Sequence, residues 1–215
     1  MWNMKMVGLG VVAFSLSLEL IGRLLCRLRR GRNPNEVLFF PSDTTCLENI
    51  FNPSPPRSCF CPLPHGAETS FSRLLRRIMS VSSSLDLCIF AFSNTNLSRA
   101  LLALQSRGVV IRVLSDKNYA TITGSQIGVL RKAGIRVRCS NRSEIMHHKF
   151  AVLDGRLLVT GSLNWTQTAV FLNEENILII EDPDLVRPFL QEFNRLWDLN
   201  DPAQVDWKVS SRRLV

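Results

Sequence analysis

The chain has 215 residues, of which 46% are hydrophobic, so it can form one domain with an ample core plus an extension. The formal net charge is +8, and a basic surface suits polyanions such as nucleic acid or acidic lipid headgroups. Aromatic residues make up 8% and include one Tyr, which argues against a stacking platform of the single-strand-binding type.

Residues 1–32 form an apolar segment with a basic flank. A helix from Trp2 to Ile21 would be about 30 Å long at roughly 1.5 Å per residue, just enough to cross a bilayer. Several arginines follow the apolar run and no cleavage site is evident, so an uncleaved anchor is predicted rather than a secretory signal. The arginines place the following domain in the cytosol. By analogy, such an anchor is typical of the mitochondrial outer membrane, with the endoplasmic reticulum as the alternative.

Residues 33–67 combine a strand over residues 36–40 with a Pro-rich segment that carries four metal-ligand side chains: Cys46, Cys59, Cys61 and His65. Three thiolates and one imidazole form a complete tetrahedral zinc set, which leaves no position open for catalysis. A cytosolic location disfavours disulfides, and a metal would order a segment with so little apolar content. The alternative is a set of unrelated side chains, because this spacing is unusual among zinc fingers.

Residues 68–200 alternate between helices and strands, which is typical of an α/β sandwich with a central sheet. The predicted helices cover residues 70–79, 96–107, 126–133 and 184–199. The predicted strands cover residues 85–92, 109–114, 135–139, 146–153, 156–160 and 176–180. Asn94 is interpreted as the cap of a helix rather than as a site residue. Residues 201–215 are a polar tail.

Chemically active side chains are concentrated after residue 146. His147 and Lys149 are two apart on a predicted strand, so they share one face while His148 points away. Asp154 begins a hairpin turn, and the returning strand brings residues 161–164 to the same edge. Lys, Ser and Asn donors suit phosphate oxygens, and the absence of a carboxylate cluster argues against a site with two metal ions. Imidazole can act as nucleophile or general acid near neutral pH.

The pattern H-x-K-x4-D followed by G-S-x-N resembles the motif of the phospholipase D superfamily, and the resemblance covers about residues 36–200. It is formed by His147, Lys149, Asp154, Ser162 and Asn164. The resemblance implies an α/β/α sandwich with His147 as the nucleophile that forms a phosphohistidine. Lys149, Asn164 and Ser162 would bind phosphate oxygens. Asp154 completes the catalytic motif in a structural role, and Glu175 matches the acid that orients the imidazole. The alternative, a solvated His and Lys, leaves the joint spacing unexplained.

The superfamily's chemistry needs a second motif histidine to protonate the leaving group, whereas this chain has one motif. The resemblance to single-motif members therefore implies a symmetric homodimer with one composite active site. Members with a Cys and His insertion after the first strand are known, so the resemblance implies structural zinc. No catalytic metal is expected, since the site lacks a carboxylate cluster.

The resemblance also implies a membrane-bound phosphodiesterase with two possible substrates. One is single-stranded RNA, cut during piRNA maturation in the germline, and the other is cardiolipin, hydrolysed to phosphatidic acid. A lipase needs an apolar rim near Asn164, for which Trp165, Val170, Phe171 and Leu172 are candidates; they could instead form dimer core. The non-enzymatic alternative is a membrane-tethered scaffold that binds RNA or a partner.

Overall fold

The computed structural model describes residues 35–52, 59–140 and 144–203. The anchor predicted for residues 1–32 and most of the polar tail lie outside the described residues. Among the residues that are described, no helix has the length and apolar character needed to cross a membrane.

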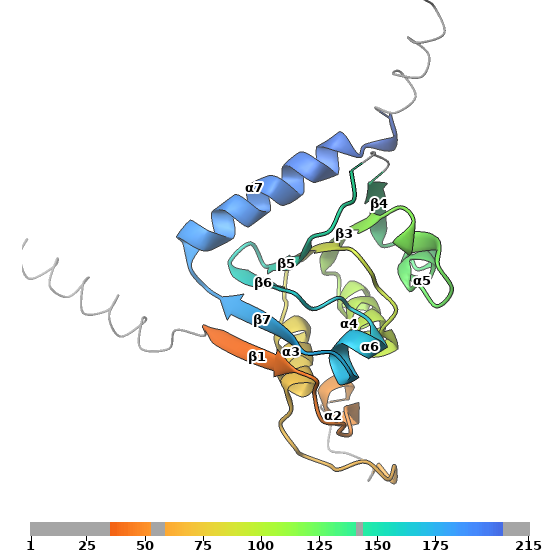
Figure 1. The fold of residues 1–215 in the computed structure, drawn as a ribbon, viewed down its shortest axis with the longest axis vertical. Helices are drawn as coiled ribbons and strands as arrows, with labels where there is room; N and C mark the ends of the chain where they lie inside the picture. The colour runs from red at the N-terminus through yellow and green to blue at the C-terminus, as the bar shows by residue number, and fades with distance from the viewer. Residues whose placement is uncertain (1–34, 53–58, 141–143, 204–215) are drawn as a thin grey trace, which may run out of the picture. The chain divides into compact units, whose positions relative to one another are not determined.

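Seven strands form one mixed sheet in the order β1-β7-β6-β5-β2-β3-β4 (Figure 1). The strands β2, β3 and β4 are parallel, because helices connect them, whereas the remaining neighbours pair antiparallel. The bounds of the strands are β1 Glu36–Phe40, β2 Ser84–Ile89, β3 Val110–Asp116, β4 Arg136–Ser140, β5 Lys149–Leu153, β6 Leu157–Gly161 and β7 Glu175–Ile180.

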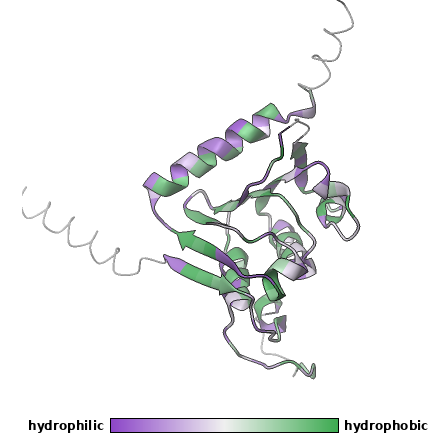
Figure 2. Cartoon of the chain, viewed as in Figure 1, coloured by the Kyte–Doolittle hydropathy of each residue, from purple (hydrophilic) through white to green (hydrophobic). Residues whose placement is uncertain are grey.

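Helices cover both faces of this sheet. The larger core contains buried residues of α3, α4, α5 and α6, and a second core lies between the sheet and α7. Figure 2 shows hydrophilic and hydrophobic residues alternating along α7, as expected of a helix with one buried face. The predicted α/β/α sandwich is therefore confirmed. The bounds of the helices are α2 Glu48–Phe51, α3 Ser70–Met79, α4 Thr95–Ser106, η1 (a 3-10 helix) Tyr119–Thr121, α5 Ile127–Lys132, α6 Gln167–Phe171 and α7 Pro183–Leu199.

Four helices, α3, α4, α6 and α7, begin at side chains that cap them. Thr69 and Ser72 form a capping box at α3. The side chain of Asn94 accepts hydrogen bonds from the amides of Asn96 and Leu97 at the start of α4, which confirms the predicted cap. Local sequence thus fixes where these helices start.

The motif strand differs from its prediction. A strand was expected from Met146, but β5 begins at Lys149, and His147 lies in the extended segment before it. The reason is that the ladder between β2 and β5 ends at the pair Ile89 and Lys149, so residue 147 has no strand partner. The short helices α2, α6 and η1 were not predicted, because segments this short show no apolar periodicity.

Candidate active site

The predicted site residues lie at one edge of the sheet, except for Asp154 and the metal ligands. The strands β2, β3 and β6 end at this edge, and β5 and β7 begin there (Figure 1). His147 and Lys149 arrive before and at the start of β5, Asn164 follows β6, and Glu175 starts β7. Three segments between residues 147 and 175 therefore contribute to one site.

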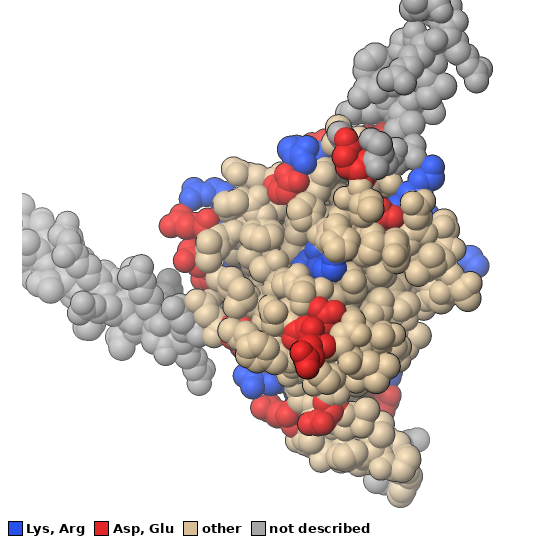
Figure 3. All heavy atoms as spheres, in the orientation of Figure 1, with Lys and Arg blue, Asp and Glu red and all other residues tan. Residues whose placement is uncertain are grey.

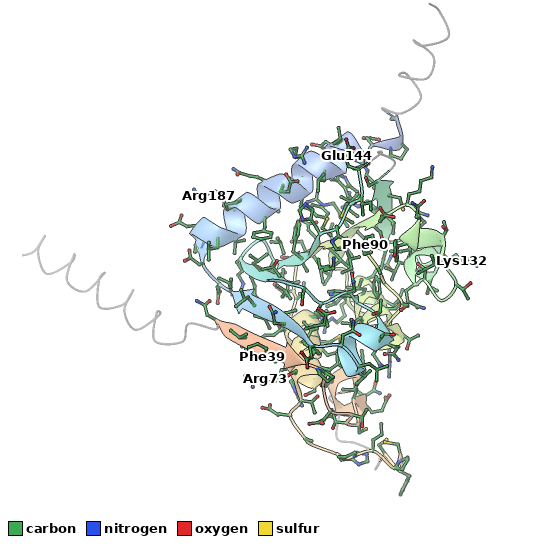
Figure 4. All side chains as sticks on the ribbon, viewed as in Figure 1. Phe39, Arg73, Phe90, Lys132, Glu144 and Arg187 are labelled. Carbon is green, nitrogen blue, oxygen red and sulfur yellow. The ribbon has the colours of Figure 1, made fainter. Side chains whose placement is uncertain are left out.

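Phe90, just after β2, joins the two motif side chains His147 and Lys149. The ring centroids of His147 and Phe90 are 4.5 Å apart in an edge-to-face arrangement. The ammonium of Lys149 lies 5.2 Å from the centroid of the same Phe90 ring and donates a hydrogen bond to the carbonyl of His147 at 2.8 Å. Figure 4 shows Phe90 near the middle of the fold. His147 itself is exposed, so its imidazole is accessible to a substrate.

His148 lies on the other side of the chain. Its ring packs 5.6 Å from that of Phe150, and its Nε2 atom is 3.8 Å from Glu192 on α7. Because α7 covers the opposite face of the sheet, this confirms that His148 points away from His147.

The pKa of Lys149 responds to its burial and to the negative charge of Glu175 in the same chain. Burial lowers the pKa of Lys149 below its ordinary value, and the negative charge of Glu175 partly opposes this shift. Glu175 also accepts a hydrogen bond from Asn173 at 3.2 Å. A partly buried ammonium beside the imidazole is well suited to binding an anion.

The G-S-x-N segment is fixed against β7. A Cβ atom at Gly161 would lie 2.1 Å from the carbonyl oxygen of Asn176, so only glycine fits there. Ser162 exchanges two hydrogen bonds with the backbone of Asn176, accepting one through its Oγ atom at 3.1 Å. The Ser162 hydroxyl can still donate its proton to a ligand.

Asn164 carries a buried polar atom that needs a partner. Its Oδ1 atom is buried and makes no hydrogen bond with any residue that the structure describes. Such atoms are uncommon in folded proteins, because leaving them unpaired costs free energy. A bound substrate or a second subunit could supply the missing donor.

Asp154 lies at the end of β5 opposite to His147. Its carboxylate accepts hydrogen bonds from the backbone amides of Ser82, Ser83 and Ser84 at 2.7–3.2 Å. Burial raises the pKa of Asp154, but these hydrogen bonds outweigh burial and hold the pKa well below its ordinary range. Positive φ angles at Asp154 (51°) and Gly155 (64°) confirm the predicted hairpin turn.

The four predicted metal ligands Cys46, Cys59, Cys61 and His65 lie together. Their ligand atoms are all within 4.8 Å of one another, and the Sγ atoms of Cys46 and Cys59 are 3.7 Å apart. Tetrahedral zinc with Zn–S bonds of about 2.3 Å would place two sulfur atoms roughly 3.8 Å apart. A hydrogen bond from His65 is the main cause that lowers the pKa of Cys59 to about 7. This donor set fits a structural zinc ion.

The apolar rim and the basic surface are only partly as predicted. Trp165 and Val170 are core residues, with exposures of 4% and 0%, so they form neither a lipid rim nor a dimer surface, whereas Leu172 is 76% exposed.

Residues 35–203 contain 17 Lys and Arg against 16 Asp and Glu residues, so most of the net charge of +8 lies in the terminal segments. Figure 3 shows charges of both signs scattered over one face rather than a single basic patch.

Comparisons with known proteins agree with this geometry. A family model described as "Cardiolipin synthase, PLD-like domain" matches residues 74–197. The chain is 57% identical over 204 residues to mitochondrial cardiolipin hydrolase of Danio rerio, covering 94% of this chain and 90% of that protein. It is 48% identical over 201 residues to the protein of the same name from Homo sapiens, covering 90% and 79%.

A solved structure shares the fold. Nuc from Salmonella typhimurium, described as a phospholipase D family member, matches with a TM-score of 0.60 and 23% identity. The match covers 76% of this chain and 93% of Nuc.

Proposed function

The chain belongs to the phospholipase D-like family and is a phosphodiesterase hydrolase, and from this premise we propose that His147 is its nucleophile. The observation that carries the proposal is the grouping of His147 and Lys149 around Phe90, with the imidazole exposed. A nucleophile must reach phosphorus while a cation neutralises the phosphate, and this pair meets both requirements.

The proposed reaction has two steps. In the first, an imidazole nitrogen of His147 bonds to phosphorus, the bond to the leaving oxygen breaks, and a second His147 protonates that oxygen. In the second, water attacks the phosphohistidine, its proton returns to the second His147, and the nucleophile is released. Lys149, Asn164 and Ser162 bind the phosphoryl oxygens, and Glu175 orients an imidazole.

The second His147 comes from another copy of the chain. His148 cannot serve, because it faces α7 on the opposite side of the sheet. A symmetric homodimer that joins two copies at the site edge supplies both imidazoles to one composite site. The unpaired Oδ1 atom of Asn164 supports a site that a single chain leaves incomplete.

Cardiolipin is the first proposed substrate, with phosphatidic acid as a product. It is supported by relatives that are named mitochondrial cardiolipin hydrolase and align over nearly the whole chain. The same name supports a mitochondrial location, with residues 1–32 anchoring the enzyme in the outer membrane and the catalytic domain in the cytosol. The cluster Cys46, Cys59, Cys61 and His65 would hold zinc for stability, while catalysis uses no metal.

Single-stranded RNA is the second proposed substrate, as in piRNA maturation. It carries the same phosphodiester group, so the same steps would cleave it. Because water rather than the 2′-hydroxyl completes the reaction, the RNA products would carry a 5′-phosphate and no 2′,3′-cyclic phosphate.

The test is product analysis with the full chain in detergent or proteoliposomes. Cardiolipin vesicles and single-stranded RNA are offered in parallel, with His147→Asn as the inactive control. Phosphatidic acid or 5′-phosphorylated RNA, produced by the wild type alone, supports the proposal. A phosphate adduct trapped on His147 supports the covalent step. Cyclic phosphate ends, or equal activity in His147→Asn, would refute the mechanism, and no cleavage of either substrate would favour the scaffold.

A further inference from the structure

Three rings form a row that begins at the exposed imidazole of the proposed nucleophile and ends at a second exposed ring. His147 packs against Phe90, and Phe90 lies 3.9 Å from Tyr119 between ring centroids, at an angle of 44°. Phe90 is 9% exposed and Tyr119 is 39% exposed. Tyr119 and the reacting imidazole are thus the two exposed ends of an aromatic row whose middle ring, Phe90, is buried.

The backbone that carries Tyr119 is fixed by a buried carboxylate. Asp116, 6% exposed at the end of β3, accepts hydrogen bonds from the amides of Asn118 and Tyr119. These bonds start η1, which also buries Ala120. The backbone at Tyr119 is therefore fixed, and the ring packs against Phe90 before a ligand binds, which reduces the entropy that binding would cost.

Charge alone gives this fold little affinity for a polyanion, because residues 35–203 carry nearly equal numbers of positive and negative side chains. Proteins that bind single strands add aromatic faces on which bases stack, and every base has such a face. A lipid substrate has no planar group next to its phosphate, whereas each nucleotide carries one.

We propose that Tyr119, backed by Phe90, is a stacking subsite for the nucleobase next to the scissile phosphodiester of single-stranded RNA. The subsite rests on the proposed function, because it places the base beside His147. With this subsite, the enzyme recognises its RNA substrate through a planar base as well as through the phosphate. Tyr119 is a binding residue here, and Phe90 is a positioning residue that connects it to the imidazole.

The experiment compares two strands of equal length and charge, one bearing bases and one built on 1-deoxyribose without bases. Dissociation constants are measured by fluorescence anisotropy with the full chain in the His147→Asn background, which prevents cleavage. We expect the base-bearing strand to bind roughly tenfold more tightly. This ratio should fall to about one in Tyr119→Ala and be retained in Tyr119→Phe, which keeps the ring.

Ile122→Ala is the matched control, since Ile122 is an exposed apolar residue (47%) just after η1, and it should keep the ratio. Equal affinity for the two strands when Tyr119 is intact would overturn the subsite. An equal loss of affinity for both strands in Tyr119→Ala would also overturn it, because Tyr119 would then only support Phe90. Cardiolipin cleavage by the enzyme with His147 intact reports separately on the proposed function. Cleavage without base preference rejects the subsite alone. Base preference without any cleavage rejects the proposed function and leaves Tyr119 as a base-binding residue only.

Discussion

The ammonium of Lys149 donates a hydrogen bond to the backbone carbonyl of His147, with the two atoms 2.8 Å apart. The lysine thus fixes the extended segment that carries the histidine, and Phe90 contacts both side chains. The two motif residues are positioned by each other as well as by the sheet. Substitution of either one should therefore affect both nucleophilic attack by His147 and phosphate binding by Lys149.

Mixing active and inactive chains tests the composite site. If one site needs His147 from two subunits, a wild-type fraction f mixed with His147→Asn gives activity proportional to f², because the mixed dimers are inactive. The two forms are refolded or co-expressed in known ratios, and phosphodiester hydrolysis is measured per total protein. Activity proportional to f would show instead that each chain works alone.

Glu175→Gln should shift the alkaline limb of the pH profile to lower pH. Burial already lowers the pKa of Lys149, and the Glu175 charge counteracts this effect, so removing the charge lowers the pKa further. The protonated ammonium is then lost at a lower pH as pH rises. The pH dependence of kcat/KM measures the shift, with the exposed neighbour Glu174→Gln as control. An unmoved limb in Glu175→Gln would contradict the assigned electrostatic coupling.

Asp154→Asn should destabilise the fold by about 2–3 kcal/mol at neutral pH, since it removes the charge that three amides bind. Asn tolerates the φ of 51° at this position, so the effect isolates the charge. The folded-state pKa of Asp154 is depressed, so its stabilisation is present above about pH 4 and is lost as pH falls through the folded-state value.

Urea unfolding at several pH values measures this effect. The difference between wild type and Asp154→Asn should shrink below about pH 4. Asp198→Asn, an exposed position on α7, should change stability little at any pH. A constant difference across the pH range would argue against a charge effect.

Gly161→Ala should cost roughly 3 kcal/mol or prevent folding, because the new Cβ atom would lie 2.1 Å from the backbone oxygen of Asn176. Gly128→Ala is the matched control, as a Cβ atom there meets no atom within 4 Å and α5 favours Ala. Thermal unfolding of both variants separates steric overlap from a general effect of replacing glycine. A Gly161→Ala protein as stable as the wild type would disprove the close approach.

The purified enzyme should contain about one zinc ion per chain, and Cys59→Ser should lose it. The expected result is a lower melting temperature, because the metal orders the segment between β1 and α3. Elemental analysis and thermal unfolding measure both effects, and Cys139→Ser, outside the metal set, should retain zinc. Immediate loss of activity with a chelator, restored by Mg²⁺, would contradict a purely structural metal.

Much of the fold could be predicted, because its long elements have clear local signals. The helix over residues 70–79 was predicted with the bounds of α3, and its amphipathic pattern matches the face that the core buries. The short α6 could not be predicted, since five residues show no clear periodicity and the Val170 carbonyl accepts a hydrogen bond from Ser42, which is distant in sequence.

The motif residues were identified from spacing alone, but their environment was not. Phe90 was assigned to a buried strand, and the low aromatic content with one Tyr argued against a stacking platform. Their rings meet only because β2 and β3 end side by side next to the start of β5. No local pattern links residues 90, 119 and 147.

The sequence by itself indicated the alternation of helices and strands, the motif and four candidate metal ligands, because backbone periodicity and residue chemistry are local properties. Tertiary structure alone decided that His148 faces α7, that Trp165 is core and that Phe90 connects His147 to Tyr119. These contacts depend on strand order and register, which pair distant segments through hydrogen bonds and shared burial.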